Sequence, residues 1–357
     1  MVTPRERHTG VLDVLDRLDA HTDEPFHLKV IDLGGPRRLV RRLRARLAGR
    51  EGAEVIELGR RVPLEALGVV APRIRTPFTF LMDNDVAVSP GWLPPLLDLA
   101  EAGARIVSPA ILERGRPDQG GHTCTHFLAG DLHVRRGLGG ARLEEHGRHR
   151  GLPLSALPLE PVPGDLLEMH AVLLETKLLQ ALDLPPLTVR EHVEVVLQAR
   201  AMGVGVVSTA RSVVSYDNLH RRMSFADLSF FRFRWSPEAT YRSSELFERR
   251  WGERFEDVAG FVAWQGRRQR YVTARAFGIP SKWAHRVSRW LARRRYGAMP
   301  SEARPDAVAT RWFENLPGGR PVRRDRDGAG ASAPAAPSPP RGDRAPIPFV
   351  GPPDVVG

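Results

Sequence analysis

The sequence predicts an α/β protein built on a doubly wound, mostly parallel sheet. Short apolar segments alternate with amphipathic segments of helical period through the first hundred residues. Strands separated by helices at this spacing are typical of parallel sheets. Two of the apolar segments end in aspartate, at Asp32 and Asp83. Ligands of such sheets bind beyond the carboxyl ends of the strands, so we expect both aspartates on one functional edge.

Each element of this part follows from a local signal. Pro36 opens a basic helix with Leu39, Val40, Leu43 and Leu47 on one face. Ser89 and Pro90 form an N-cap followed by proline, which predicts another helix start. The predicted strands are 27–33, 54–58, 78–82 and 105–109, and the predicted helices are 36–47 and 89–102.

The second half of the chain is more helical. Residues 112–158 are rich in Gly, His and Arg and predict loops with short antiparallel strands. The predicted helices are 172–182, 188–202, 225–251 and 257–296, and the predicted extended segments are 204–207 and 212–216. From about residue 316 the chain turns to Pro, Gly, Ala, Ser and Arg, a composition that predicts disorder. We therefore expect a first domain over 1–220, a helical extension over 221–315 and a disordered tail over 316–357.

The composition is that of a soluble globular protein, with 42% hydrophobic and 27% charged residues in 357. The net charge of +11 permits a basic nucleic-acid-binding protein as one alternative. No zinc-finger, ribonucleoprotein-type or helix-turn-helix motif supports that alternative. The same charge suits diphosphates, anionic lipid or acidic acceptors.

Neither a spanning segment nor a secretory leader is apparent. No apolar run approaches the roughly 18 residues that cross a bilayer. Charged residues from Arg5 onward interrupt any apolar leader, so we expect a cytoplasmic protein. Cys124 is the only cysteine, which excludes an intramolecular disulfide and a multi-cysteine zinc site.

The segment FTFLMDNDVAVSPGW, residues 78–92, places Asp83 and Asp85 in a turn at a strand end. Carboxylates there can bind a hard divalent cation, although aspartate and asparagine also form ordinary β-turns. With its apolar strand and the following Pro-Gly-Trp-Leu, the segment resembles the DxD motif of family-2 glycosyltransferases. The resemblance implies a GT-A fold in which Asp83, Asn84 and Asp85 bind the donor diphosphate with Mg or Mn.

The resemblance extends over roughly residues 2–251. VTPRER (2–7) looks like the first strand of the family, and VIDLGGP (30–36) looks like the second, whose acidic residue contacts the nucleobase or ribose. Asp32 matches that acidic residue. FRWSPEATYRSSELFERRW (233–251) resembles a carboxyl-terminal region of one bacterial branch. The first domain is thus expected to bind a nucleotide sugar, with a UDP-sugar as the first candidate.

Three positions depart from the family pattern. PLEALG (63–68) replaces the usual loop bearing Asn or Arg, and Glu191-His192 replaces a frequent Glu-Asp pair. Tyr216 stands where many members have a histidine that binds the metal. These departures support an alternative in which the chain is a degenerate transferase that binds a nucleotide sugar or a partner without turnover.

Inverting transfer requires a base for the acceptor hydroxyl. Glu191 is the first candidate, His192 the second and Glu194 the third. Glu191 also ends the sequence Thr188-Val189-Arg190-Glu191, which has the pattern of a capping box, so a purely structural role stays open.

Glu168 and His170 alternate on a predicted strand and share a face. Their segment, VPGDLLEMHAV (162–172), resembles the one that lines the acceptor side. We expect Glu168 and Glu194 on that side, and His170 as a replacement third metal ligand or as an ordinary structural histidine. In a metal-binding role His122, His126 and His133 are weaker candidates, and a solvated loop explains them as well.

Residues 282–296 (KWAHRVSRWLARRRY) place Trp283, Val287, Trp290 and Leu291 on one helical face among basic residues. Such a helix suits peripheral contact with an anionic membrane at its inner face, or packing on the catalytic domain. The prediction is a metal-dependent, inverting glycosyltransferase. Its acceptor, whether a glycan, a lipid-linked or a small molecule, is not specified by any motif.

Overall fold

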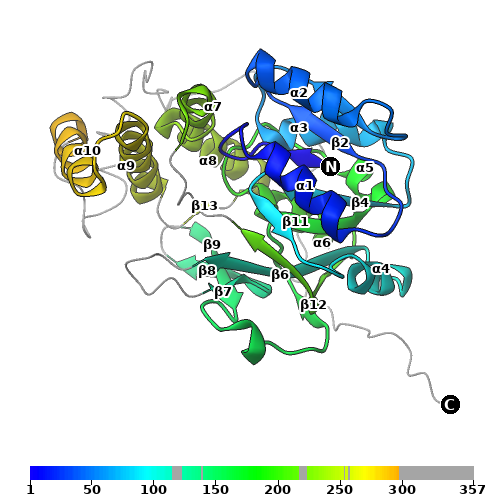
Figure 1. Ribbon diagram of the computed structural model, residues 1–357. Coiled ribbons are helices and arrows are strands. Elements are labelled where there is room, and N and C mark those ends of the chain that lie inside the picture. Colours follow the sequence, from blue (N-terminus) through cyan, green and yellow to red (C-terminus); the bar gives the residue numbers. More distant parts are fainter. Residues whose placement is uncertain (115–122, 138–139, 217–222, 253, 256–257, 297–357) are drawn as a thin grey trace, which may run out of the picture. The chain divides into compact units, whose positions relative to one another are not determined.

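The computed structural model describes residues 1–114, 123–137, 140–216, 223–252, 254–255 and 258–296 (Figure 1). All of them belong to one compact unit, Met1–Gly319. The predicted tail over 316–357 and the end of the predicted extension lie outside the described residues. The helical region, defined here as α7 to α10, belongs to the same unit as the sheet.

The centre of this unit is a mostly parallel sheet, as predicted. Its main strands are β10 (Val162–Gly164), β12 (Val206–Tyr216), β6 (Ile106–Arg114), β11 (Ala171–Glu175), β4 (Phe78–Asp83), β1 (Val2–Thr3), β2 (Lys29–Asp32) and β3 (Glu54–Glu57), in this spatial order. Strands β3, β2, β1 and β4 are mutually parallel, and β6 is parallel to β12. Strand β11 lies between β4 and β6 and is antiparallel to both, so the strands on its two sides run in one direction.

Shorter strands extend this arrangement. Strand β5 (Val86–Val88) pairs with β12, and β7 (Thr123–Phe127) pairs with β6. Strands β8 (Ala129–Gly137), β9 (Gly140–Arg148) and β13 (Arg254–Phe255) form a separate small sheet. The expectation of antiparallel strands within 112–158 is therefore confirmed, although β6 reaches Arg114 and β8 and β9 are long rather than short.

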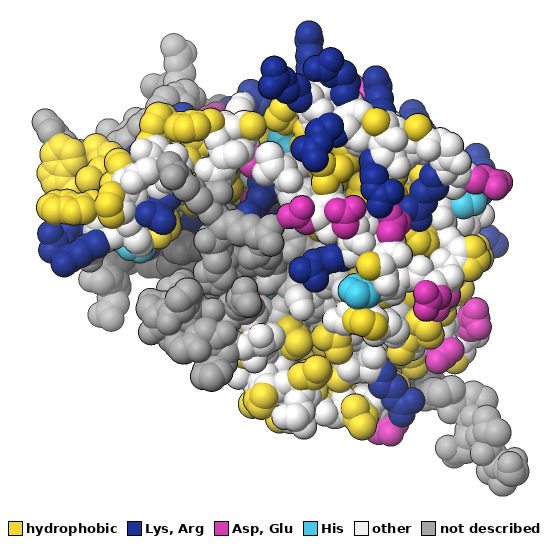
Figure 2. All heavy atoms as spheres, in the orientation of Figure 1, with side chains coloured by type: hydrophobic (Ala, Val, Ile, Leu, Met, Phe, Trp, Pro, Cys, Tyr) yellow, Lys and Arg dark blue, Asp and Glu magenta, His cyan; other side chains and the backbone are white. Residues whose placement is uncertain are grey.

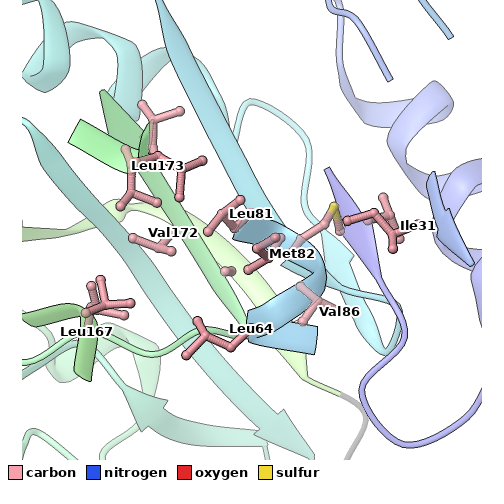
Figure 3. Packing of buried hydrophobic residues seen from close by; sticks show 14 of the residues in the cluster. Ile31, Leu64, Leu81, Met82, Val86, Leu167, Val172 and Leu173 are labelled. Atoms are coloured by element: carbon pink, nitrogen blue, oxygen red, sulfur yellow. The ribbon is translucent and has the colours of Figure 1, made fainter. Parts of the chain in front are cut away.

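Helices follow the strands, as the α/β prediction requires (Figure 1). They are α1 (Val11–His21), α2 (Arg37–Leu47), α3 (Pro63–Val70), α4 (Pro94–Glu101), α5 (Thr176–Ala181) and α6 (Glu191–Ala201), with 3-10 turns at Ala71–Arg73 and Leu154–Ala156. Helix α2 buries the four predicted apolar residues and leaves its arginines outside. Figure 3 shows the core between strands and helices, with Leu81 and Met82 of β4 beside Val172 and Leu173 of β11.

The helical region consists of α7 (Phe225–Arg234), α8 (Pro237–Trp251), α9 (Val258–Ala276) and α10 (Ser281–Tyr296). The two long helices predicted over 225–251 and 257–296 are thus each divided in two. Pro237 and Pro280 stand at the divisions, where proline cannot continue the preceding helix. Among the described residues, no helix is both long and apolar enough to cross a membrane.

Four local predictions are wrong. Glu168 and His170 do not lie on a strand: they fall between β10 and β11, and His170 is part of a turn that directly precedes β11. The helix expected from Ser89 begins only at Pro94, because Gly91 adopts a left-handed φ of 68°. The helix expected over 172–182 begins at Thr176, because the apolar residues before it form the buried strand β11. Thr188 does not cap α6: the cap position is Arg190, and the Thr188 hydroxyl lies 2.9 Å from the Ser243 hydroxyl.

Candidate functional site

The sheet topology places Asp83 beside His170. Strand β11 is antiparallel to β4, so its amino end meets the edge where β1, β2 and β4 end, here called the carboxyl edge. The Asp83 amide donates to the His170 carbonyl at 2.9 Å. Their side chains also meet, with Asp83 Oδ2 and His170 Nδ1 3.1 Å apart. Antiparallel β11 therefore brings His170, the residue before its start, to the edge where the parallel strands end.

Asp83, Asp85 and His170 form a compact set of potential metal ligands. One donor atom from each lies within 4.8 Å of the others, and all three side chains are buried. Within the described part of the chain, Asp85 Oδ1 and His170 Nδ1 are buried without a hydrogen-bond partner, since the contact to Asp83 lacks hydrogen-bond geometry. Buried polar atoms without partners are costly, and a divalent cation would satisfy both. The donor set fits a cation such as Mg²⁺ or Mn²⁺.

The protonation of this set follows from burial and close charges. Burial raises the pKa of Asp83, but Arg5 and His170 outweigh it and hold the pKa below its ordinary value. Burial and the charge of Asp83 raise the pKa of Asp85 well above its ordinary value. Burial and Arg5 lower the pKa of His170, so its imidazole is neutral at pH 7. Neutral imidazole is the form that binds metal ions.

The segment after β1 lines the same site. Arg5 Nη1 donates to Asp83 Oδ2 at 2.9 Å. The Asn84 amide group donates to the Arg7 carbonyl at 2.5 Å and accepts from the Arg5 backbone at 3.2 Å. Both polar ends of Asn84 are thus used by the backbone. The guanidinium atoms Nε and Nη2 of Arg7 are buried and have no hydrogen-bond partner among the described residues.

Asp32 ends β2 at the carboxyl edge, as predicted for a parallel sheet. Its carboxylate accepts from the backbone amides of Gly34 at 3.3 Å and Gly35 at 2.8 Å. A Cβ at Gly35 would lie 2.7 Å from Asp32 Oδ1, so this close approach requires glycine. The turn holds the carboxylate beside the His8 ring.

The helical region contacts the segment that follows β1. Asp227 of α7 is fully buried and accepts from the His8 amide at 2.7 Å and from the Thr9 hydroxyl at 2.6 Å. Arg234 of α7 lies over the Trp235 ring, 4.3 Å from its centroid. Arg234 also lines a narrow cavity with Arg5 and Asp83. The region predicted as an extension is therefore part of the site.

Glu191 lies at the start of α6 and lines the same cavity, but its carboxylate is bound by Arg234. Both side chains are largely buried, with exposed fractions of 10% and 2%. The structure thus brings the first predicted base to the site in an ion pair. Glu194, expected on the acceptor side, does not line this cavity: it is fully buried and accepts from Arg250 at 3.0 Å and Trp251 at 2.8 Å.

The Glu191–Arg234 pair should make a measurable contribution to stability. We expect Glu191→Gln to lower the free energy of unfolding by about 3 kcal/mol, because it leaves Arg234 buried without its countercharge. Glu65→Gln is the matched control, since its pair with Arg61 is 32–41% exposed and should contribute no more than about 1 kcal/mol. Urea unfolding measures both variants. Equal losses in the two variants would contradict the assignment of a buried pair.

His192 faces a different set of groups. Its Nε2 lies 2.8 Å from Glu145 Oε2 of β9. Burial lowers the pKa of His192, but Glu145 and Glu168 outweigh it and the pKa is raised. His192 in turn helps to lower the pKa of Glu145 to about 2. For Glu168, burial raises the pKa, yet the charges of His192, His170 and His126 lower it below its ordinary value.

Several residues of this site did not follow from sequence reasoning. Arg5, Arg234 and Glu145 carry no local motif, and their contacts join distant segments. His126 had a signal, since HTCTH alternates as a strand does; it lies on β7, with its ring 5.5 Å from that of His170. His133 is exposed on β8, and His122 lies outside the described residues.

Comparisons with known proteins add little at the level of sequence. No protein-family model and no curated protein matches the chain. Among solved structures, the chain is similar to GalNAc-T7 with UDP, GalNAc and Mn²⁺, at 13% identity and a TM-score of 0.47 over 84% of this chain. It spans 57% of that GalNAc-T7 chain. It is also similar to S. aureus TarS 1–349 in complex with UDP-GlcNAc, at 12% identity and a TM-score of 0.44, covering 82% of this chain and 90% of that one.

Proposed function

We propose that this chain is a glycosyltransferase with a GT-A-type site that uses a nucleoside-diphosphate sugar. The observation that carries the proposal is the convergence of Asp83, Asp85 and His170 at the carboxyl edge, with buried donor atoms that lack partners. Basic side chains surround these ligands, as a diphosphate requires. The resemblance of residues 78–92 to a DxD segment supports the same assignment.

Each residue has a defined part in this proposal. Asp83, Asp85 and His170 hold Mg²⁺ or Mn²⁺, which when bound neutralises the leaving diphosphate. Arg7, whose buried Nε and Nη2 have no hydrogen-bond partner among the described residues, is proposed to bind the same diphosphate. Asp32 contacts the ribose or nucleobase. Asn84 positions the loop after β1, because its amide is occupied by backbone groups.

We assign the base to His192. Glu191 is committed to Arg234, and Glu194 is committed to Arg250 and Trp251. His192 is held by Glu145 through Nε2, and such a carboxylate orients the ring and stabilises its protonated form. Glu168 lies close enough to His192 to raise its pKa, and we assign Glu168 to the acceptor side. Glu191 then positions Arg234.

Ligand binding tests the proposed function without a known acceptor. A panel of nucleotide sugars, UDP-sugars first, is screened by thermal unfolding with Mn²⁺ and with excess chelator. A donor at about 100 times its dissociation constant should add roughly 2.7 kcal/mol of stability in Mn²⁺ and much less in chelator. A panel in which no member stabilises the chain would reject the proposal.

A degenerate, non-catalytic binder is the second candidate. It is favoured by Tyr216, which stands where many members of the resembled family have a metal-binding histidine. Tyr216 is buried, and its ring centroid lies 4.0 Å from that of His170. Under this candidate the same panel would find a stabilising nucleotide sugar, but neither hydrolysis nor transfer would follow. Binding and turnover therefore separate the two candidates.

We also propose peripheral contact with an anionic membrane through α10. Its apolar residues are exposed, with Trp283 and Trp290 each at 56%. Figure 2 shows hydrophobic side chains gathered over α10 with basic ones beside them. Lys282 and Arg286 are exposed on the same helix, and this mixture suits an anionic bilayer surface at the inner face of the membrane.

Vesicle sedimentation tests this contact. The double variant Trp283→Glu, Trp290→Glu should weaken binding to phosphatidylglycerol vesicles by about tenfold or more, because charged carboxylates replace both indoles at the bilayer surface. Leu159→Glu is the control, since Leu159 is 65% exposed and lies between the 3-10 turn at Leu154–Ala156 and β10 rather than on α10. Wild-type sedimentation of the double variant, or equal binding to neutral vesicles, would contradict membrane contact.

A further inference from the structure

A second group of potential metal ligands adjoins the first. His126, Glu168 and His170 each offer a donor atom, and these atoms lie within 4.8 Å of one another. His126 comes from β7, His170 immediately precedes β11, and Glu168 lies two residues before His170. The rings of His126 and His170 meet edge to face, with centroids 5.5 Å apart. His170 therefore belongs to both groups.

His126 has the surroundings of a metal ligand. Its Nδ1 lies 2.9 Å from Glu113 Oε2 on β6. A histidine that binds a metal through one ring nitrogen usually donates the other N–H to a carboxylate or carbonyl. An ionised Glu113 carboxylate can only accept a hydrogen bond, which requires the proton on Nδ1 of neutral His126 and leaves the Nε2 lone pair for a ligand. This observation is independent of the clustering of the three side chains.

The two groups differ in the chemistry of their donors. Asp83 and Asp85 supply oxygen, which suits Mg²⁺ and Mn²⁺. His126, Glu168 and His170 supply two nitrogens and one oxygen, a set typical of zinc sites that keep an open position. Tyr216 packs on both imidazoles, with ring centroids 5.2 Å from His126 and 4.0 Å from His170, and helps to hold their orientation.

We propose that His126, Glu168 and His170 form a Zn²⁺ site that shares His170 with the Asp83–Asp85 site. Neutral imidazole has only one nitrogen with a free lone pair, so His170 binds one ion at a time and Zn²⁺ opposes occupancy of the neighbouring site by Mn²⁺. Zn²⁺ binding stands on the geometry of the three ligands alone. Its effect on Mn²⁺ rests on the proposed function.

Zinc titration of the full chain, first stripped with chelator, tests the site. Isothermal titration calorimetry with Zn²⁺ alone should show one site that His126→Gln weakens by more than about 100-fold, because a ligand is lost. Glu113→Gln should weaken it by about 10–100-fold, the usual effect of losing the carboxylate behind a ligating histidine. His21→Gln is the control, since His21 lies in the last turn of α1 and is not among these ligands.

The expected pattern across variants is specific. Asp85→Asn should retain the Zn²⁺ site, and circular dichroism should show that each variant is folded. Manganese competition, followed by the electron paramagnetic resonance of Mn²⁺, should show displacement by Zn²⁺ in the wild type but not in His126→Gln. Zn²⁺ affinity that is unchanged in both His126→Gln and Glu168→Gln, or lost in Asp85→Asn, would overturn the proposal. Neither result depends on whether the chain transfers a sugar.

Discussion

Asp85→Asn is expected to abolish metal-dependent turnover while leaving the fold intact. Loss of a carboxylate ligand removes several kcal/mol of charge stabilisation from the reaction, equivalent to a fall of about 10³-fold or more in rate. The fold should tolerate the change, because Asn has nearly the same shape and Asp85 Oδ1 has no hydrogen-bond partner among the residues described. The measurement is the rate of donor hydrolysis in Mn²⁺, together with the midpoint of thermal unfolding.

Asp98→Asn provides the matched control for this prediction. Asp98 lies on α4 with an exposed side chain, so the same change of charge there should leave both rate and unfolding midpoint unchanged. Turnover of Asp85→Asn at the level of the control would remove Asp85 from the metal site. Unfolding of Asp85→Asn alone would show that the carboxylate is structural.

His192→Gln is expected to lower turnover by about 10²–10⁴-fold, the usual contribution of a general base. The wild-type rate should rise with pH along an acidic limb that lies above 6.5, because only neutral His192 can accept a proton. Burial and the charge of Arg190 lower the pKa of His192, but Glu145 and Glu168 raise it by more, so the pKa lies above its ordinary value. The variant should lose this limb.

Glu145→Gln distinguishes a base from a structural histidine. Removal of the Glu145 carboxylate lowers the pKa of His192, so the acidic limb of the rate should move to lower pH. A merely structural role for His192 would leave the limb in place in both variants. A limb that persists in His192→Gln would exclude this residue as the base and direct attention to Glu168.

Much of the carboxyl edge could be predicted because its signals are local. Asp32 and Asp83 each end an apolar segment, and parallel strands bring such ends to one edge. The placement of His170 beside Asp83 was predicted only as one alternative. It depends on β11 running against β4, which no short segment of sequence specifies.

The remaining contacts are long-range and could not be predicted from local patterns. Arg234 meets Glu191 across 43 positions, and Asp227 meets His8 across 219. Local rules also failed where tertiary contacts competed with them. Thr188 has the pattern of a cap, yet its hydroxyl pairs with the Ser243 hydroxyl of α8, and both residues are buried.

Metal-dependent breakdown of a nucleotide sugar is the decisive test of the proposed glycosyltransferase site. The measurement is the release of nucleoside diphosphate from the donor that stabilises the chain most, in Mn²⁺ and in excess chelator. We expect release in Mn²⁺, its loss in chelator and its loss in Asp85→Asn. Release that continues undiminished in chelator, or no release in Mn²⁺ even with a panel of acceptor hydroxyls present, would contradict a metal-dependent glycosyltransferase.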